Sequence, residues 1–157
     1  MVRYLAQRVT SLACGAELPP VERVSGSEAK TKRRILIVDD DANSTHLVKI
    51  LVERSGPYLV LEENDAAKAD QTAHNFKPDV ILLDIVMPKI DGGELATQIE
   101  ADRELHDTPI IFLTALVTHG EAKSGLHIQG HPVVAKPISI PELIDAIEKH
   151  LPVRAEC

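Results

Sequence analysis

The chain has 157 residues, of which 44% are hydrophobic and 26% charged, enough for one globular domain with a sizeable core and a short appendage. Aromatic residues make up only 3% and Trp is absent, which argues against a surface that stacks bases or sugars, and the net charge of -7 disfavours direct binding to nucleic acid. Two cysteines near opposite ends, Cys14 and Cys157, suit neither a disulfide framework nor a thiolate metal site.

Residues 1–31 are predicted to be an N-terminal extension and linker. Its apolar residues recur at steps of three and four, which indicates a short amphipathic helix that Leu18-Pro19-Pro20 ends. No apolar run has the length of a transmembrane helix, and the start of the chain does not fit a secretory signal. We therefore expect a cytoplasmic protein in a reducing compartment, with no contact to membranes. The apolar residues that indicate this helix are Val2, Leu5, Val9 and Leu12.

Residues 32–151 are predicted to form the compact domain, and 152–157 a tail. Buried strands alternate with helices five times, which favours a parallel sheet with helices on both faces. Of the doubly wound arrangements, the flavodoxin-like strand order 2-1-3-4-5 suits five strands of this length. Strands are expected at 35–38, 58–61, 80–83, 109–113 and 133–135, and helices at 42–55, 65–75, after Asp91, at 121–126 and after Ser139.

Helix starts are indicated by capping patterns. Asp91-Gly92-Gly93-Glu94 and Ser139-Ile140-Pro141-Glu142 have the spacing of a capping box, in which the first and fourth residues bond each other's backbone amides. Asp41 is interpreted as a loop acid or helix cap near Asn43-Ser44. The apolar face of the helix after Asp91 is expected to use Leu95, Ile99 and Leu105.

Polar residues follow four of the predicted strands. Asp39 and Asp40 follow the first, Asp84 the third, Thr114 the fourth and Lys136 the fifth. Because the carboxyl ends of parallel strands open into one crevice, these side chains are expected to meet. Clustered carboxylates need a neutralising cation, and oxygen ligands without Cys or His favour Mg²⁺. A lysine and a hydroxyl beside them suit a transferring phosphoryl group, for which an Asp can be the nucleophile.

These motifs together resemble the receiver domain of bacterial two-component response regulators, the CheY-like fold. Each motif alone is weak, but they occur in the right order at the ends of the right strands, over about residues 32–151. The motifs are Asp39-Asp40, Leu83-Asp84-Ile85-Val86-Met87-Pro88 with Asp91-Gly92, Thr114-Ala115 and Lys136-Pro137.

The resemblance implies that Asp84 accepts a phosphoryl group from the phosphohistidine of a histidine kinase or histidine phosphotransfer protein. It also implies that Asp84 and Asp40 ligate Mg²⁺, that Asp39 helps to hold the ion, and that the backbone carbonyl of Val86 adds a ligand. The chain would then be an enzyme only in its own phosphorylation and dephosphorylation.

By the same resemblance, Thr114 would bond a phosphoryl oxygen and move on activation, and Lys136 would pair with the phosphoryl group. The Lys136-Pro137 peptide is expected to be cis. Only six residues follow Leu151, so we expect a stand-alone receiver that signals by binding a downstream protein, as a monomer or a homodimer.

The sequence departs from the family pattern in three places. The Tyr or Phe usually found three residues before the lysine is Val133, so an aromatic switch is not expected. The segment before the fifth strand reads Gly130-His131-Pro132, which predicts an irregular region. Val86 and Leu116 stand where family members flank the path of the hydrolytic water, and two apolar side chains would leave the aspartyl phosphate long-lived.

Two other functions remain open at this point. The first is an interaction module of the same fold that is never phosphorylated, which the intact set of acids, Thr and Lys argues against. The second is a haloacid-dehalogenase-like phosphatase, whose nucleophile would follow the first strand in a D-x-D-x-[TV] pattern. Here the fifth residue of Asp39-Asp40-Asp41-Ala42-Asn43 is Asn, and no cap domain is evident.

Overall fold

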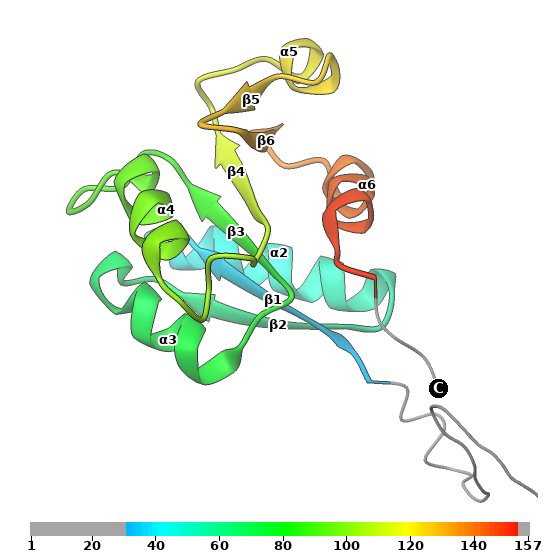
Figure 1. The fold of residues 1–157 in the computed structure, drawn as a ribbon. Coiled ribbons are helices and arrows are strands. Elements are labelled where there is room, and N and C mark those ends of the chain that lie inside the picture. Colours follow the sequence, from blue (N-terminus) through cyan, green and yellow to red (C-terminus); the bar gives the residue numbers. More distant parts are fainter. Residues whose placement is uncertain (1–30, 154–157) are drawn as a thin grey trace, which may run out of the picture. The chain divides into compact units, whose positions relative to one another are not determined.

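The computed structural model describes residues 31–153 (Figure 1). The expected N-terminal helix, most of its linker, most of the tail and both cysteines lie outside these residues. Within 33–152 the elements are β1 (Arg33–Val38), α2 (Ala42–Ser55), β2 (Tyr58–Glu63), the 3-10 helix η2 (Ala66–Lys68), α3 (Ala69–Phe76), β3 (Val80–Asp84), α4 (Gly92–Ala101), β4 (Ile110–Thr114), α5 (His119–Lys123), β5 (His127–Ile128), β6 (His131–Ala135) and α6 (Ile140–His150).

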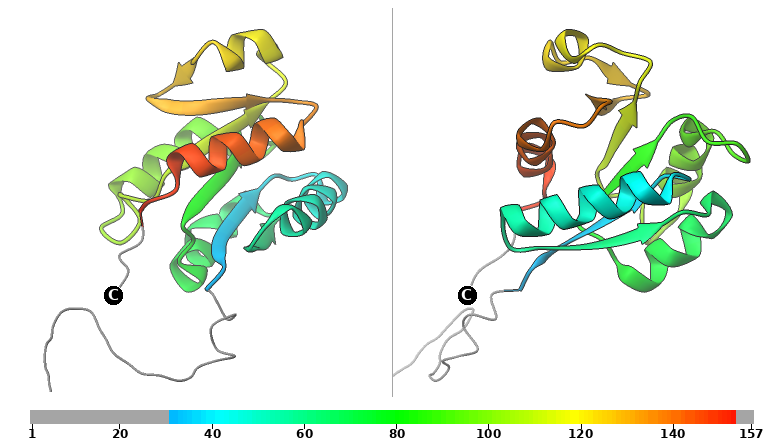
Figure 2. Two further views of the ribbon diagram at one scale, coloured as in Figure 1. Left: turned by 90° about the vertical axis from the view of Figure 1, so that its right-hand side faces the viewer. Right: turned by 180° about the vertical axis from the view of Figure 1, so that it is seen from behind.

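The central sheet has the order β2-β1-β3-β4-β6-β5. The first five strands in that order are parallel, which confirms the predicted arrangement, with β6 as the predicted fifth strand. β3 and β4 are buried at every residue, because helices cover both of their faces. Two apolar cores result. One holds Leu36, Leu83 and Phe112 with α3 and α4, and the other holds Ile37, Leu82 and Leu113 with α2 and α6. The two pairs of helices lie on opposite faces of the sheet (Figures 1 and 2).

A sixth strand corrects the prediction of a five-stranded sheet. β5 pairs with β6 in the antiparallel direction, with Ile128 opposite His131. Between them Gln129 and Gly130 both have positive φ, 54° and 82°, as tight hairpin turns require. The predicted helix at 121–126 is instead the five-residue α5, which precedes Gly125 at φ 92°. The β5–β6 hairpin closes one edge of the sheet, and α5 lies beside the hairpin (Figure 1).

Capping and turn residues in the sequence predicted where most of the helices begin and end. The bounds predicted for α2 are those observed, and the Asp41 side chain caps the helix by accepting from the amides of Asn43 and Ser44. The helix expected at 65–75 is split into η2 and α3. Leu105 is buried as expected, but it lies beyond the end of α4 rather than on its face.

The two predicted capping boxes are not formed. Ser139 is the N-cap of α6 but makes no side-chain cap hydrogen bond. The Glu142 carboxylate, which would complete the box, is engaged by His119 at 3.0 Å and Lys123 at 3.3 Å. Asp91 caps α4 through the amide of Gly93 alone. A complete capping box instead joins Thr118 and Glu121 at α5. None of the helices in residues 31–153 is both long and apolar enough to cross a membrane.

Candidate functional site

Three carboxylates meet at the carboxyl ends of β1 and β3, as the strand order predicts. One oxygen each from Asp39, Asp40 and Asp84 lies within 4.8 Å of the others. Asp39 and Asp84 are buried, whereas Asp40 faces solvent. Asp84 is the last residue of β3, and the register of β1 with β3 places Val38 beside Leu83, so the acids that follow Val38 reach the same crevice.

Lys136 joins two of these acids. Its Nζ lies 2.8 Å from Oδ2 of Asp39 and 3.3 Å from Oδ1 of Asp84. The residue follows β6 directly, and its backbone amide donates to the carbonyl of Thr114 at 2.8 Å. The Lys136-Pro137 peptide is cis, as expected. The Lys136 ammonium therefore compensates part of the negative charge of the two acids. It reaches them from the end of a strand that is almost one hundred residues away from Asp39 in the chain.

Burial and like charge raise the pKa of Asp84. Desolvation is the main cause and the neighbouring Asp39 carboxylate adds to it, against the opposing effect of Lys136, and together they raise the pKa of Asp84 to about 6. Burial alone would lower the pKa of Lys136, but its hydrogen bond to Asp39 and the charges of both acids outweigh burial and raise it. The site thus carries more negative charge than one ammonium can neutralise.

The donor set fits a hard divalent cation. Asp39, Asp40 and Asp84 supply only oxygen, and the exposure of Asp40 leaves room for water ligands, as Mg²⁺ requires. The amide of Val86 donates to Oδ1 of Asp84 at 3.4 Å, so this residue does border the site. A role for its backbone carbonyl as a ligand stays a prediction.

Thr114 ends the adjacent strand β4 and is fully buried. Asp84 is paired in register with Leu113, so Thr114 lies one residue farther along the crevice. Its Oγ1 accepts from the amide of Leu116 at 3.0 Å, which leaves its own proton for another acceptor. Val133, which replaces the usual aromatic residue, is buried in the apolar core that also holds residues of α4. Val86 and Leu116 both face solvent, with exposed fractions of 60% and 70%.

Sequence reasoning gave no role at the site to two residues that touch its backbone. A Cβ on Gly92 would lie 2.2 Å from the carbonyl oxygen of Asp84, so only glycine fits there. The amide nitrogen Nδ2 of Asn64 donates to the carbonyl of Asp39 at 2.7 Å. The second contact had a signal in the sequence, because β2 lies beside β1 in the predicted order and Asn64 follows β2.

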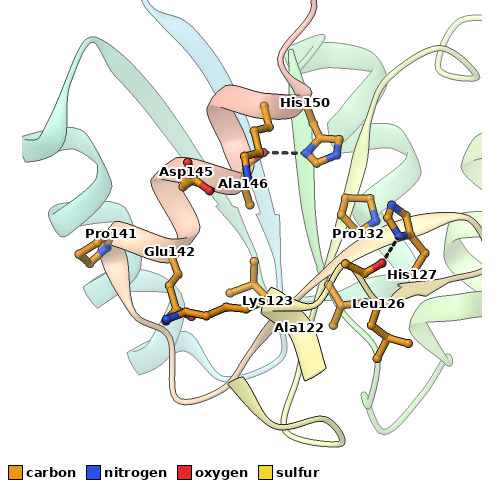
Figure 3. Close-up of a pocket in the computed structure, with 14 residues that line it drawn as sticks. Ala122, Lys123, Leu126, His127, Pro132, Pro141, Glu142, Asp145, Ala146 and His150 are labelled. Carbon is orange, nitrogen blue, oxygen red and sulfur yellow. Dashed lines mark hydrogen bonds and ion pairs between the residues drawn. The ribbon is translucent and has the colours of Figure 1, made fainter. Parts of the chain in front are cut away.

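A groove away from the acids lies between α5, the β5–β6 hairpin and α6 (Figure 3). It has a volume of about 560 Å³, and none of Asp39, Asp40, Asp84 or Lys136 lines it. Apolar side chains such as Leu126 and Pro132 share it with charged ones such as Lys123 and Asp145. The crevice with the acids is therefore distinct from this groove.

Comparison with known proteins identifies the family that this chain resembles. The family model for the response regulator receiver domain matches residues 35–148. The polar-differentiation response regulator DivK of Brucella anthropi is 30% identical over 119 residues, which is 76% of this chain and 96% of DivK. The receiver domain of the Francisella response regulator 1452 superposes with a TM-score of 0.62 at 28% identity, over 75% of this chain and 95% of that one.

Longer proteins also match. The "Probable transcriptional regulator ycf27" of Guillardia theta is 37% identical over 116 residues, which is 74% of this chain but 44% of that protein. The chain thus spans less than half the length of this relative.

Proposed function

The chain belongs to the family of response regulator receiver domains of two-component systems, and from this membership we propose that it accepts a phosphoryl group on Asp84. The donor is the phosphohistidine of a histidine kinase or histidine phosphotransfer protein. The observation that carries the proposal is the buried pair of acids, Asp39 and Asp84, bridged by Lys136 next to the exposed Asp40.

Asp84, Lys136 and Thr114 are each proposed to have a separate role in the phosphoryl transfer. A carboxylate oxygen of Asp84 attacks phosphorus, the P–N bond of the phosphohistidine breaks, and its electron pair returns to the imidazole nitrogen. Lys136 already contacts Oδ1 of Asp84, so its ammonium is placed to pair with the incoming phosphoryl oxygens. The hydroxyl of Thr114 supplies a further donor once it turns toward them.

Mg²⁺ held by Asp39, Asp40 and Asp84, with the Val86 carbonyl as a further ligand, would neutralise the charge that builds up on the phosphoryl oxygens. Apart from this self-modification, the protein is proposed to act in the cytoplasm through protein–protein contacts.

Phosphorylation is tested with acetyl phosphate and Mg²⁺, followed by intact mass. We expect a gain of one phosphoryl group that Asp84→Ala abolishes and Mg²⁺ removal suppresses. Asp107→Ala is the matched control, because the Asp107 side chain is 91% exposed, and it should leave the gain intact. A wild-type protein that gains no mass would favour the alternative of an interaction module that is never phosphorylated.

The lifetime of the aspartyl phosphate is a second expected property. Val86 and Leu116 are exposed and apolar, so neither can orient an attacking water. Replacing both with polar residues, as in Val86→Asn combined with Leu116→Asn, should shorten the lifetime of labelled phosphoprotein. Leu59→Asn, at an exposed apolar position on β2, serves as the control. Rapid spontaneous decay of the wild-type phosphoprotein in Mg²⁺ would contradict the expectation.

A further inference from the structure

Asn64 joins the end of β2 to the backbone of the acid site. Its Nδ2 donates to the carbonyl oxygen of Asp39 at 2.7 Å and to Oγ1 of Thr45 at 2.9 Å. Both hydrogens of one amide group are thereby used, which fixes the plane of the Asn64 side chain. The contact is to main chain rather than to a carboxylate, so it orients the site without adding charge to it.

The carbonyl that Asn64 holds belongs to the peptide between Asp39 and Asp40. The Asp39 side chain is itself held by the amide of Asp41 at 3.0 Å and by Lys136 at 2.8 Å. Asp40, in contrast, is exposed, and its carboxylate makes no hydrogen bond or ion pair with residues 31–153. The direction of the Asp40 side chain thus depends on its backbone, and Asn64 fixes the peptide that precedes it.

Thr45 in turn holds Asn64. This residue of α2 is fully buried, and its Oγ1 lies 2.9 Å from Oε1 of Glu62 and 3.1 Å from the carbonyl of Ala42. A hydroxyl has one proton to donate and lone pairs to accept with, so these two groups receive the proton and the Asn64 amide meets a lone pair. A continuous chain of hydrogen bonds therefore runs from Glu62 through Thr45 and Asn64 to Asp39.

We propose that Asn64 is a positioning residue for divalent-cation binding, with Thr45 as the group that orients it. The inference rests on the proposed function, since it concerns the same Mg²⁺ site. Groups that orient metal ligands through hydrogen bonds change metal affinity by roughly 10- to 100-fold when they are removed. Asn64 acts on Asp40 through the shared peptide, and it touches neither the cation nor the phosphoryl group.

The test replaces Asn64 by a residue of similar shape that cannot donate. In Asn64→Leu, the Mg²⁺ concentration for half-maximal labelling by acetyl phosphate should rise by roughly 10-fold or more. The labelling rate at saturating Mg²⁺ should stay close to that of the wild type, because Asp84 and Lys136 are unchanged. Thr45→Val should shift the half-saturation in the same direction by less. Asn75→Leu, at an exposed asparagine on α3, is the matched control.

A titration with Mg²⁺ alone, followed by the amide NMR signals of Asp40 and Asp41, gives a readout independent of phosphorylation. The dissociation constant should be raised in Asn64→Leu and unchanged in Asn75→Leu. If the Leu variant does not fold, Asn64→Ala takes its place. Lower thermal stability with an unchanged dissociation constant would reduce Asn64 to a structural role and overturn the inference. A wild-type protein without any Mg²⁺ response would instead overturn the proposed metal site, and this inference with it.

Discussion

Gly92 lies where a side chain would collide with the backbone that carries Asp84. A Cβ there would be 2.2 Å from the Asp84 carbonyl oxygen and 2.7 Å from Cα of Ile85. Both are main-chain atoms, which cannot swing aside as a flexible side chain can. The amide of Gly92 also donates to the carbonyl of Ile85 at 2.8 Å. The start of α4 is therefore seated directly against the loop that follows the proposed phosphoacceptor.

Gly92→Ala should destabilise the protein by about 1–3 kcal/mol, because either α4 or the Asp84–Ile85 backbone must shift. It should also slow labelling of Asp84. Gly120→Ala is the matched control, since its Cβ would meet only Oγ1 of Thr118 at 3.9 Å. In the helix α5 that substitution should be neutral or stabilising by up to about 1 kcal/mol. Urea unfolding measures both effects, and equal stability of the two variants would refute the packing argument.

At the scale of elements, His74 links α3 to the end of α4. Its Nε2 lies 2.9 Å from Oδ2 of Asp102, the C-cap residue of α4, and its Nδ1 lies 2.9 Å from the backbone carbonyl of Asp70. The hydrogen bond to that carbonyl is the main cause that raises the pKa of His74, and the charges of Asp102 and Asp70 add to it against the effect of burial. Asp102 also accepts from the amides of Glu104 and Leu105, so the bridge reaches the turn with the buried Leu105.

The His74 bridge predicts a pH dependence of stability. A histidine whose pKa is raised by folding stabilises the folded state fully below its unfolded pKa of about 6.5, and this contribution is lost as the pH rises through the raised value. The free energy of unfolding should therefore exceed that of His74→Gln at pH 5.5, and the difference should shrink by pH 8.5. His106→Gln, at a histidine whose side chain is 55% exposed, is the control. A difference that does not vary with pH would exclude the bridge as the cause.

At the scale of the whole domain, the crowded acids make stability depend on the cation. The raised pKa of Asp84 means that the folded state binds its proton more tightly than the unfolded chain does. This contribution to stability is lost as the pH rises from the ordinary value of 3.8 to about 6. Above that pH the ionised Asp84 opposes folding until a cation offsets the charge.

Without Mg²⁺ at pH 7.5, Asp84→Asn should raise the free energy of unfolding by on the order of 2 kcal/mol, because the buried charge is removed. Mg²⁺ at about 100 times its dissociation constant should stabilise the wild type by about 2.7 kcal/mol, or roughly 5–10 °C in melting temperature. The variant should gain much less. Calorimetry with Mg²⁺ and with a chelator measures both, with Asp107→Asn as the control. Equal gains in the wild type and Asp84→Asn would place the cation elsewhere.

Much of this domain could be predicted from its sequence because the relevant signals are local. Aliphatic runs such as Val80–Leu83 and Ile110–Leu113 indicate buried parallel strands, and Asp41 with Gly56 bounds α2. Parallel strands then bring their carboxyl ends to the same side of the sheet, independently of the conformation of the loops. That rule alone placed Asp39, Asp40, Asp84 and Lys136 together.

Tertiary structure decided the features that depend on partners distant in the chain. Glu142 pairs with His119 and Lys123 rather than capping its own helix, because their side chains come within reach only after folding. The Gln129–Gly130 turn produces a hairpin, since β6 offers β5 an edge to pair with. The contact of Asn64 with the Asp39 carbonyl arises in the same way, from two strand ends that the sheet holds side by side.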